Sequence, residues 1–233
     1  MKPKLFFCHL PKTAGTSVRT ALEEQFRPFE VVPDKWMKER SAGDYPHPAV
    51  VMTTLAHQNN FVKFLCGHYH LSMRNFLDGC LSILILREPV QRTISNLNDK
   101  IARGMNRDYV LQSLDSGILP MENNVMCRYL GADFDYASPD WESRPFLEMP
   151  IKDPQAMLER AISNMKTVEI LCLTEDLQPL ERRLSQYGYD ISIGRHNENL
   201  GEKLALTERQ MKTIQLYNEL DSRLYQAARS ILG

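Results

Sequence analysis

Cysteine is scarce in this sequence and never occurs as a CxxC pair. The five cysteines lie far apart along the chain, at Cys8, Cys66, Cys80, Cys127 and Cys172. This spacing excludes the paired-cysteine motifs that bind zinc or carry dithiol redox chemistry. Three of the five stand within apolar stretches, so we expect the cysteines to serve as small buried hydrophobic residues.

Long apolar runs are also missing. A bilayer span needs about 20 consecutive apolar residues, and no segment approaches that length. The short apolar run over residues 5–10 is interrupted by His9 and followed by Lys12, and it has neither the length nor the cleavage site of a signal peptide. We therefore predict a cytoplasmic protein with no membrane span.

An excess of charge of one sign is absent as well. The formal net charge is -1, from 28 Lys and Arg against 29 Asp and Glu, which argues against a chain built to bind nucleic acid or anionic membranes. The composition is 43% hydrophobic and 24% charged, as in ordinary globular proteins. No repeat or linker divides the chain, so we expect one domain over residues 1–233. The sequence does not indicate an oligomeric state.

Apolar segments followed by helical patterns indicate the fold. The strand candidates cover residues 4–10, 80–86 and 168–173, and each leads into a helical stripe. The nearly continuous apolar character of 80–86 is typical of a strand buried on both faces of a parallel sheet. The sequence thus predicts an α/β protein, a P-loop-like three-layer sandwich with a central parallel sheet flanked by helices.

Further helical patterns occupy much of the remaining chain. They are expected at 106–116, 121–130 and 153–166. One long C-terminal helix is predicted from the capping box at 207–210 to residue 231, because Thr207 and Gln210 have the spacing of reciprocal caps.

The loop between the first strand and its helix is a candidate anion site. The first turn of a helix has unpaired N–H groups and a partial positive charge, and small residues let the backbone close around oxygen atoms. The residues expected to contribute amides, two hydroxyls and one mobile cation are Lys12, Thr13, Ala14, Gly15, Thr16 and Ser17. This combination suits a phosphate or phosphosulfate group; alternatively, Thr16 and Ser17 merely cap the helix.

The loop differs from the phosphate loop of NTPases. In GxxxxGK[ST] the lysine follows the last glycine and precedes the metal-binding hydroxyl, whereas Lys12 precedes Gly15 by three positions. A metal-dependent NTPase is therefore disfavoured, although a P-loop nucleotide or small-molecule kinase stays as an alternative.

The string HLPKTAGTS over residues 9–17 resembles the 5′-phosphosulfate loop of the carbohydrate sulfotransferases related to heparan sulfate 2-O-sulfotransferase. The resemblance implies that the donor is PAPS (3′-phosphoadenosine 5′-phosphosulfate), that PAP is the product, and that no metal is required. It also implies that Lys12 takes part in catalysis by stabilising charge on the departing 5′-phosphate.

The same family holds the 3′-phosphate of the donor with an arginine at a strand end and a serine eight residues later. Arg87 and Ser95 are similar in content and spacing, and the planar guanidinium of arginine is suited to phosphate. Glu88 stands where the family more often has aspartate. The resemblance further suggests that Arg195, near the C-terminal helix, completes the nucleotide site.

The segment Cys66-Gly67-His68-Tyr69-His70 resembles a His-Gly-His segment of the 2-O-sulfotransferases. The proposed catalytic base of that family maps to His68, while Cys66 replaces the companion histidine. His70 is close enough in sequence to act as a substitute base or to contact the substrate.

The acceptor is only broadly indicated. The resemblance implies a hydroxyl group on a carbohydrate or small molecule, and a segment around Arg128 is loosely similar to a family segment, which makes Arg128 a candidate substrate contact. Residues 28–60 and 104–150 are the expected acceptor-binding regions. A non-catalytic PAP-binding protein is a further alternative, because Cys66 replaces a family histidine.

Overall fold

The computed structural model describes residues 2–39, 41, 45–134, 136, 146–194 and 204–233. By contacts, the chain groups into two compact units, one of residues 1–86 and 164–197 and the other of residues 87–163 and 198–233. The expectation of a single domain over 1–233 stays a prediction. Among the described residues, no helix combines the length and apolar character that crossing a membrane requires.

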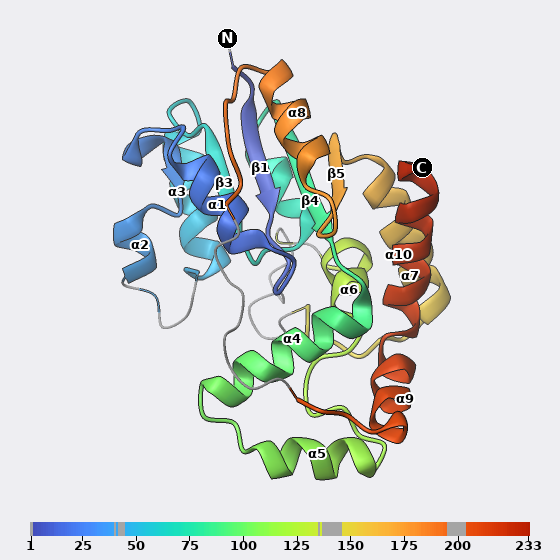
Figure 1. The fold of residues 1–233 in the computed structure, drawn as a ribbon. Helices are drawn as coiled ribbons and strands as arrows, with labels where there is room; N and C mark the ends of the chain where they lie inside the picture. The colour runs from blue at the N-terminus through green and yellow to red at the C-terminus, as the bar shows by residue number, and fades with distance from the viewer. Residues whose placement is uncertain (1, 40, 42–44, 135, 137–145, 195–203) are drawn as a thin grey trace. The chain divides into compact units, whose positions relative to one another are not determined.

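The first unit contains a five-stranded sheet in the order β2-β3-β1-β4-β5, with every neighbouring pair parallel (Figure 1). The strands are β1 (Lys4–Cys8), β2 (Val31–Val32), β3 (Phe64–Gly67), β4 (Cys80–Leu86) and β5 (Ile170–Leu173). Its helices and 3-10 turns are α1 (Gly15–Glu23), η1 (Pro28–Glu30), α2 (Lys35–Glu39), α3 (Pro48–Gln58), η2 (Leu71–Phe76) and α8 (Gln178–Gln186). The parallel sheet flanked by helices confirms the predicted fold class.

The central strand β1 is the best-buried part of this sheet. Its register places Leu5 opposite Phe64 of β3 and Leu81 of β4, and residues 5–8 are all fully buried. A strand enclosed on both faces must be apolar at successive positions, which explains the continuous run seen in the sequence. The loop that follows β1 is therefore anchored to the rigid centre of the unit.

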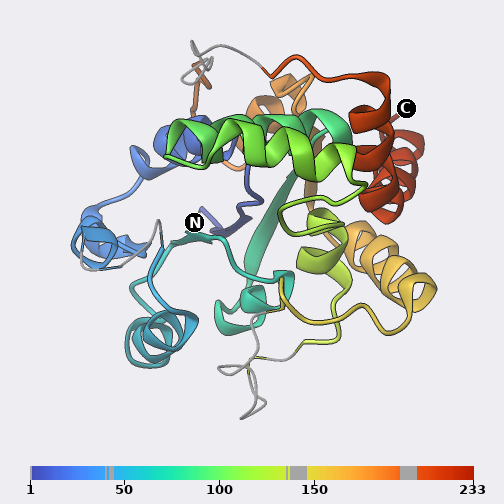
Figure 2. The ribbon, with the colours of Figure 1, turned by 90° about the horizontal axis from the view of Figure 1, so that it is seen from below.

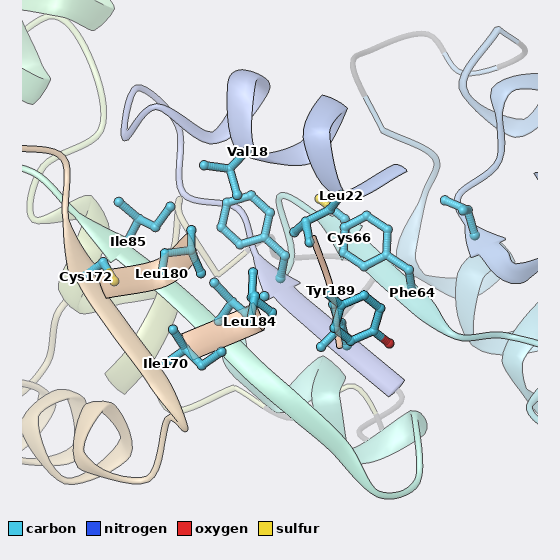
Figure 3. Packing of buried hydrophobic residues seen from close by; sticks show 14 residues of the cluster. Val18, Leu22, Phe64, Cys66, Ile85, Ile170, Cys172, Leu180, Leu184 and Tyr189 are labelled. Atoms are coloured by element: carbon cyan, nitrogen blue, oxygen red, sulfur yellow. The ribbon is translucent and has the colours of Figure 1, made fainter. Parts of the chain in front are cut away.

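Helices α1 and α8 cover one face of the sheet. Val18 and Leu22 of α1, together with Leu180 and Leu184 of α8, belong to one buried cluster with alternate residues of the strands (Figure 3). Fully burying a leucine or valine side chain contributes about 1.5–3 kcal/mol. This packing holds the first turn of α1 at the end of β1.

The second unit is helical. It contains α4 (Pro89–Ala102), α5 (Arg107–Asp115), α6 (Val125–Gly131), most of α7 (Pro154–Lys166), α9 (Glu208–Tyr217) and α10 (Glu219–Leu232). Figure 2 shows α4, in green, beside the red C-terminal helices. Leu97, Leu114 and Ile214 share one core cluster, which joins α4, α5 and α9.

The C-terminal region contains two helices where one was predicted. The capping box at Thr207 is confirmed as the start of α9, but this helix ends at Asn218, which has φ -119° and ψ 25°. Asn124 explains the break, because its side-chain oxygen accepts hydrogen bonds from the N–H groups of Leu220 and Asp221. A contact 96 or 97 residues away in sequence thus starts a new helix, and sequence periodicity cannot reveal such a contact.

Candidate functional site

The loop between β1 and α1 has an unusual backbone. Lys12 and Ala14 both lie in the left-handed region, with φ of 68° and 59°. A side chain with a Cβ atom makes this conformation costly, by about 1–2 kcal/mol for each residue. Between them, Thr13 is fully buried and its hydroxyl donates to the Leu10 carbonyl oxygen. Strain of this kind is retained where the surroundings enforce it, and it occurs often at binding loops.

Helix α1 begins without a side-chain cap. Its N-cap residue is Ala14, which makes no side-chain hydrogen bond to the first turn, and that turn contains no acidic residue. Helix α4 is capped by Glu88 and α5 by Asn106, whereas α3, α6 and α8 also begin without a side-chain cap. An N-cap side chain normally pairs with an N–H group of the first turn. The start of α1 therefore has the features of an anion site, and neither Thr16 nor Ser17 is its N-cap.

Gly15 allows the histidine before the loop to lie directly against the start of the helix. A Cβ atom on Gly15 would lie 1.8 Å from Cδ2 and 1.9 Å from Nε2 of His9. Both distances are far below van der Waals contact, so any larger residue would displace either the His9 ring or the helix. The loop is thus built on the His9 ring, which is 5% exposed.

We expect Gly15→Ala to lower the free energy of unfolding by about 1–3 kcal/mol, as overpacking does. Thermal or denaturant unfolding measures this effect. The cost should shrink when His9→Ala removes the ring that the new methyl group would meet, because contacting residues are energetically coupled. An equal loss of unfolding free energy in the wild-type and His9→Ala backgrounds would contradict the close approach of Gly15 to the His9 ring.

His68 follows β3 and lies next to the first residue of the loop. Its Nδ1 atom is 2.6 Å from the His9 carbonyl oxygen. A carbonyl oxygen can only accept, so Nδ1 must carry the proton, and the neutral ring then has its lone pair on Nε2. This is the tautomer that a general base needs, since Nε2 can take a proton while Nδ1 keeps its hydrogen bond.

His9 supports this arrangement as a neutral residue. Burial lowers the pKa of His9 well below its ordinary value, and the nearby positive charges of Arg19 and Lys38 act in the same direction. Its Nδ1 atom lies 2.6 Å from the hydroxyl oxygen of Tyr45. Tyr45 also accepts a hydrogen bond from Arg19, at 3.0 Å.

Cys66, at the position of the family's first histidine, lies in the interior. It is 1% exposed and belongs to the core cluster beneath α1 and α8 (Figure 3). Burial raises the pKa of its thiol to about 12, so the thiol stays protonated at neutral pH. Cys66 is therefore unsuited to a second acid–base role, which leaves His68 as the stronger candidate of the pair.

His70 has a local structural contact. Its Nδ1 atom accepts a hydrogen bond from the Ser72 N–H group at the start of η2, and it also lies 2.9 Å from the Ser72 hydroxyl oxygen. The side chain is 4% exposed, and burial lowers the pKa of His70 to about 4. These contacts describe a helix cap, and the role of His70 in substrate binding stays a prediction.

Arg87 and Ser95 belong to the second unit, unlike the loop and the three histidines. Arg87 directly follows β4, and Ser95 lies within α4; both are partly exposed. The carboxylate of Glu88 accepts hydrogen bonds from the N–H groups of Val90 and Gln91, which explains why an acidic residue suits this position. The assignment of Arg87 and Ser95 to a 3′-phosphate stays a prediction.

The Arg128 side chain is buried in the second unit, where it forms several hydrogen bonds. Its guanidinium donates to the carbonyl oxygens of Asn123, Phe146 and Met149 and to the side-chain oxygen of Asn123. These contacts hold the segment around residues 146–149, so they describe a structural role. A substrate contact by Arg128 stays a prediction, and Arg195 lies outside the described residues.

Two residues near His68 were not anticipated from the sequence. Tyr45 and Arg19 join His9 in one hydrogen-bonded group, yet Tyr45 stands 21 residues before Cys66 in a proline-containing segment without a helix or strand pattern. A tyrosine in a polar, irregular segment has no distinguishing signal, so only the fold reveals its position.

Comparisons with known proteins agree with the geometry. A model described as the Sulfotransferase family matches residues 1–138, a range that includes the loop, His68, Arg87 and Ser95. A comparison with curated proteins gives no match. The matched range spans 138 of the 233 residues and begins with the strand, the left-handed loop and the uncapped helix described above, and the chain therefore belongs to the Sulfotransferase family.

Proposed function

We propose that the protein transfers a sulfuryl group from PAPS to a hydroxyl group on an acceptor, with His68 as the general base. The observation that carries the proposal is the hydrogen bond from His68 Nδ1 to the His9 carbonyl oxygen. This bond fixes a proton on Nδ1, so that the neutral form of the ring has its lone pair on Nε2, beside the first residue of the proposed anion-binding loop.

The loop is assigned to the 5′ end of the donor. The uncapped first turn of α1 supplies N–H groups and the positive end of the helix dipole. Lys12, Thr16 and Ser17 add a cation and two hydroxyls. A loop that offers backbone amides and a lysine suits a phosphosulfate, because the phosphate and the sulfate of this group bear adjacent negative charges.

The proposed step is an in-line transfer. The acceptor oxygen forms a bond to sulfur while the bond between sulfur and the bridging oxygen of the 5′-phosphate breaks. His68 takes the acceptor's proton on Nε2, and the electron pair of the broken bond stays on the 5′-phosphate of PAP. Lys12 and the amides of α1 stabilise that developing charge, which is the main contribution expected of a protein in group transfer of this type.

The remaining assignments follow from the resemblance. Arg87 and Ser95 are proposed to bind the 3′-phosphate, and Arg195 to complete the nucleotide site. The acceptor is proposed to be a carbohydrate or a small molecule with a hydroxyl group. A cytoplasmic location is part of the same proposal.

Binding of nucleotides tests the donor assignment. We expect PAP to raise the melting temperature, 5′-AMP to raise it much less, and ATP with Mg²⁺ to have little effect, because only PAP carries both a 5′- and a 3′-phosphate. Stabilisation follows the logarithm of ligand concentration over Kd, so titrations give relative affinities. Preference for ATP with Mg²⁺ would instead indicate a kinase.

Arg87→Ala should weaken PAP binding by about tenfold or more, as expected for a lost charge-assisted hydrogen bond, and leave binding of 5′-AMP unchanged. Arg209→Ala is the matched control, because Arg209 is an exposed arginine of α9. Equal loss of PAP and 5′-AMP affinity in Arg87→Ala would contradict the 3′-phosphate assignment.

A further inference from the structure

The imidazole of His68 contacts two other aromatic rings. The ring centroid of His9 is 4.5 Å away, with the ring planes tilted by 45°, and that of Tyr45 is 4.6 Å away, in an edge-to-face contact with an interplanar angle of 74°. Ring contacts of this kind are favourable and directional. Together with the bond from Nδ1 to the His9 carbonyl oxygen, they restrict rotation of the His68 ring about both of its side-chain torsions.

The hydroxyl group of Tyr45 is itself fixed. Arg19 Nη1 donates to it at 3.0 Å, so the oxygen acts as an acceptor there and its own proton is directed elsewhere. The nearest acceptor is Nδ1 of His9, at 2.6 Å; the Cys66 sulfur is 3.8 Å away. Tyr45 therefore donates to His9 while its ring contacts His68.

The backbone beside Tyr45 is held by the same segment that carries His68. The hydroxyl of Tyr69 donates to the Pro46 carbonyl oxygen, at 2.9 Å, and Tyr69 is 2% exposed. Its ring occupies the space beside Gly67, where a Cβ atom would come within 2.1 Å of it. Residues 67–69 thus present His68 and also position the tyrosine that contacts it.

Tyr45 is suited to orient the general base and unsuited to act as the base itself. Burial raises the pKa of its hydroxyl far above the ordinary value, and the charge of Arg19 opposes this only in part. The hydroxyl therefore stays protonated throughout the physiological range, as a neutral donor to His9. Its oxygen already accepts a hydrogen bond from Arg19, so Tyr45 is unsuited to take the proton of the acceptor.

We infer that Tyr45 is a positioning residue for the transfer reaction, which holds the His68 imidazole against the His9 carbonyl oxygen in one orientation. The inference rests on the proposed function and extends it by a residue outside the recognised motifs. A base held in one orientation reaches the reacting proton without a further loss of rotational freedom, so the benefit appears in kcat.

Tyr45→Phe tests the inference, because it removes the hydroxyl and keeps the ring. We expect kcat to fall about tenfold, the effect of losing one hydrogen bond of ordinary strength, while the KM for PAPS and the stabilisation by PAP change less than about twofold. Tyr45→Leu, which also removes the ring, should lower kcat further. Tyr109→Phe is the matched control, because Tyr109 is 55% exposed on α5, and it should retain full activity.

A double-mutant cycle shows whether Tyr45 acts through His68. In a His68→Asn background, Tyr45→Phe should have no further effect on residual turnover, because the group that it positions is gone. An equal tenfold loss in both backgrounds, or unchanged kcat in the single variant, would overturn the inference.

The ring nitrogens of His68 provide a readout that does not depend on activity. In the wild type, ¹⁵N chemical shifts should show the proton on Nδ1, and Tyr45→Phe should shift the two nitrogens toward averaged values. Unchanged ¹⁵N shifts in the variant would refute the positioning role. If the wild type shows neither PAPS turnover nor PAP binding, the proposed function fails, whereas the NMR result still decides whether Tyr45 fixes His68.

Discussion

Lys12→Ala is expected to lower kcat by about 10²- to 10³-fold, with a much smaller change in KM for the acceptor. Removing one preorganised group that stabilises charge in the transition state has an effect of this size. Lys12 stands in the strained loop with φ 68°, before the uncapped first turn of α1. The measurement is steady-state turnover of PAPS at saturating acceptor.

Lys35→Ala provides the control for the loss of one positive charge from the same unit. The Lys35 side chain is 90% exposed in α2, and it forms a long ion pair with Glu39, at 3.8 Å. Such surface pairs contribute little, so activity should be retained. Lys12→Ala with kcat within about threefold of the wild type would contradict the role of Lys12 in stabilising the leaving group.

His68→Asn is expected to lower kcat by about 10²- to 10⁴-fold, the usual contribution of a positioned general base, and to leave PAP binding intact. The asparagine amide can still donate to the His9 carbonyl oxygen, as Nδ1 of His68 does. It has no basic nitrogen corresponding to Nε2. The variant therefore separates the structural contact of His68 from its proposed chemistry.

His70→Asn distinguishes the two histidines of this segment. Asparagine is a good helix cap, so it can accept the Ser72 N–H hydrogen bond that His70 accepts in η2. If His70 acts only as a cap, turnover should stay within about threefold of the wild type. A large loss in His70→Asn together with a small one in His68→Asn would assign the base to His70.

The strands that the sequence predicted were those with long apolar runs. β1, β4 and β5 lie within the three predicted segments, since burial on both faces demands successive apolar residues. β2 has only two residues, and β3 has four and ends at Gly67. Segments this short carry too little pattern to be recognised, although β3 is the strand that presents His68.

The parts of the site close to the strands could be predicted, and the contacts that join them could not. The position of the loop at 12–17, between a buried strand and a helix, could be predicted from the apolar run and the helical pattern that follows it, and its role as an anion site stays a prediction. The support of this loop by the His9 ring and the contact between Tyr45 and His68 depend on tertiary packing. Both bring together residues far apart in sequence, and no local pattern encodes them.

Two predicted substrate contacts, Arg128 and His70, stay predictions, and the structure gives both side chains partners that their sequence positions do not reveal. Arg128 and His70 have residue types that suit recognition of a polar acceptor. In the structure, the Arg128 guanidinium donates to carbonyl oxygens, and His70 caps a turn of helix. A buried polar side chain must satisfy its own hydrogen bonds, and this requirement is invisible until its surroundings are known.

The most direct test of the account is the product of the reaction. Purified protein would be incubated with PAPS and a panel of carbohydrate and small-molecule alcohols, and mass spectrometry would follow PAP and sulfated acceptors, with His68→Asn in parallel. The account predicts an acceptor-dependent release of PAP matched by a sulfate ester on the acceptor, both strongly reduced in the variant. PAP binding without any sulfated product across the panel, or equal product from wild type and variant, would contradict it.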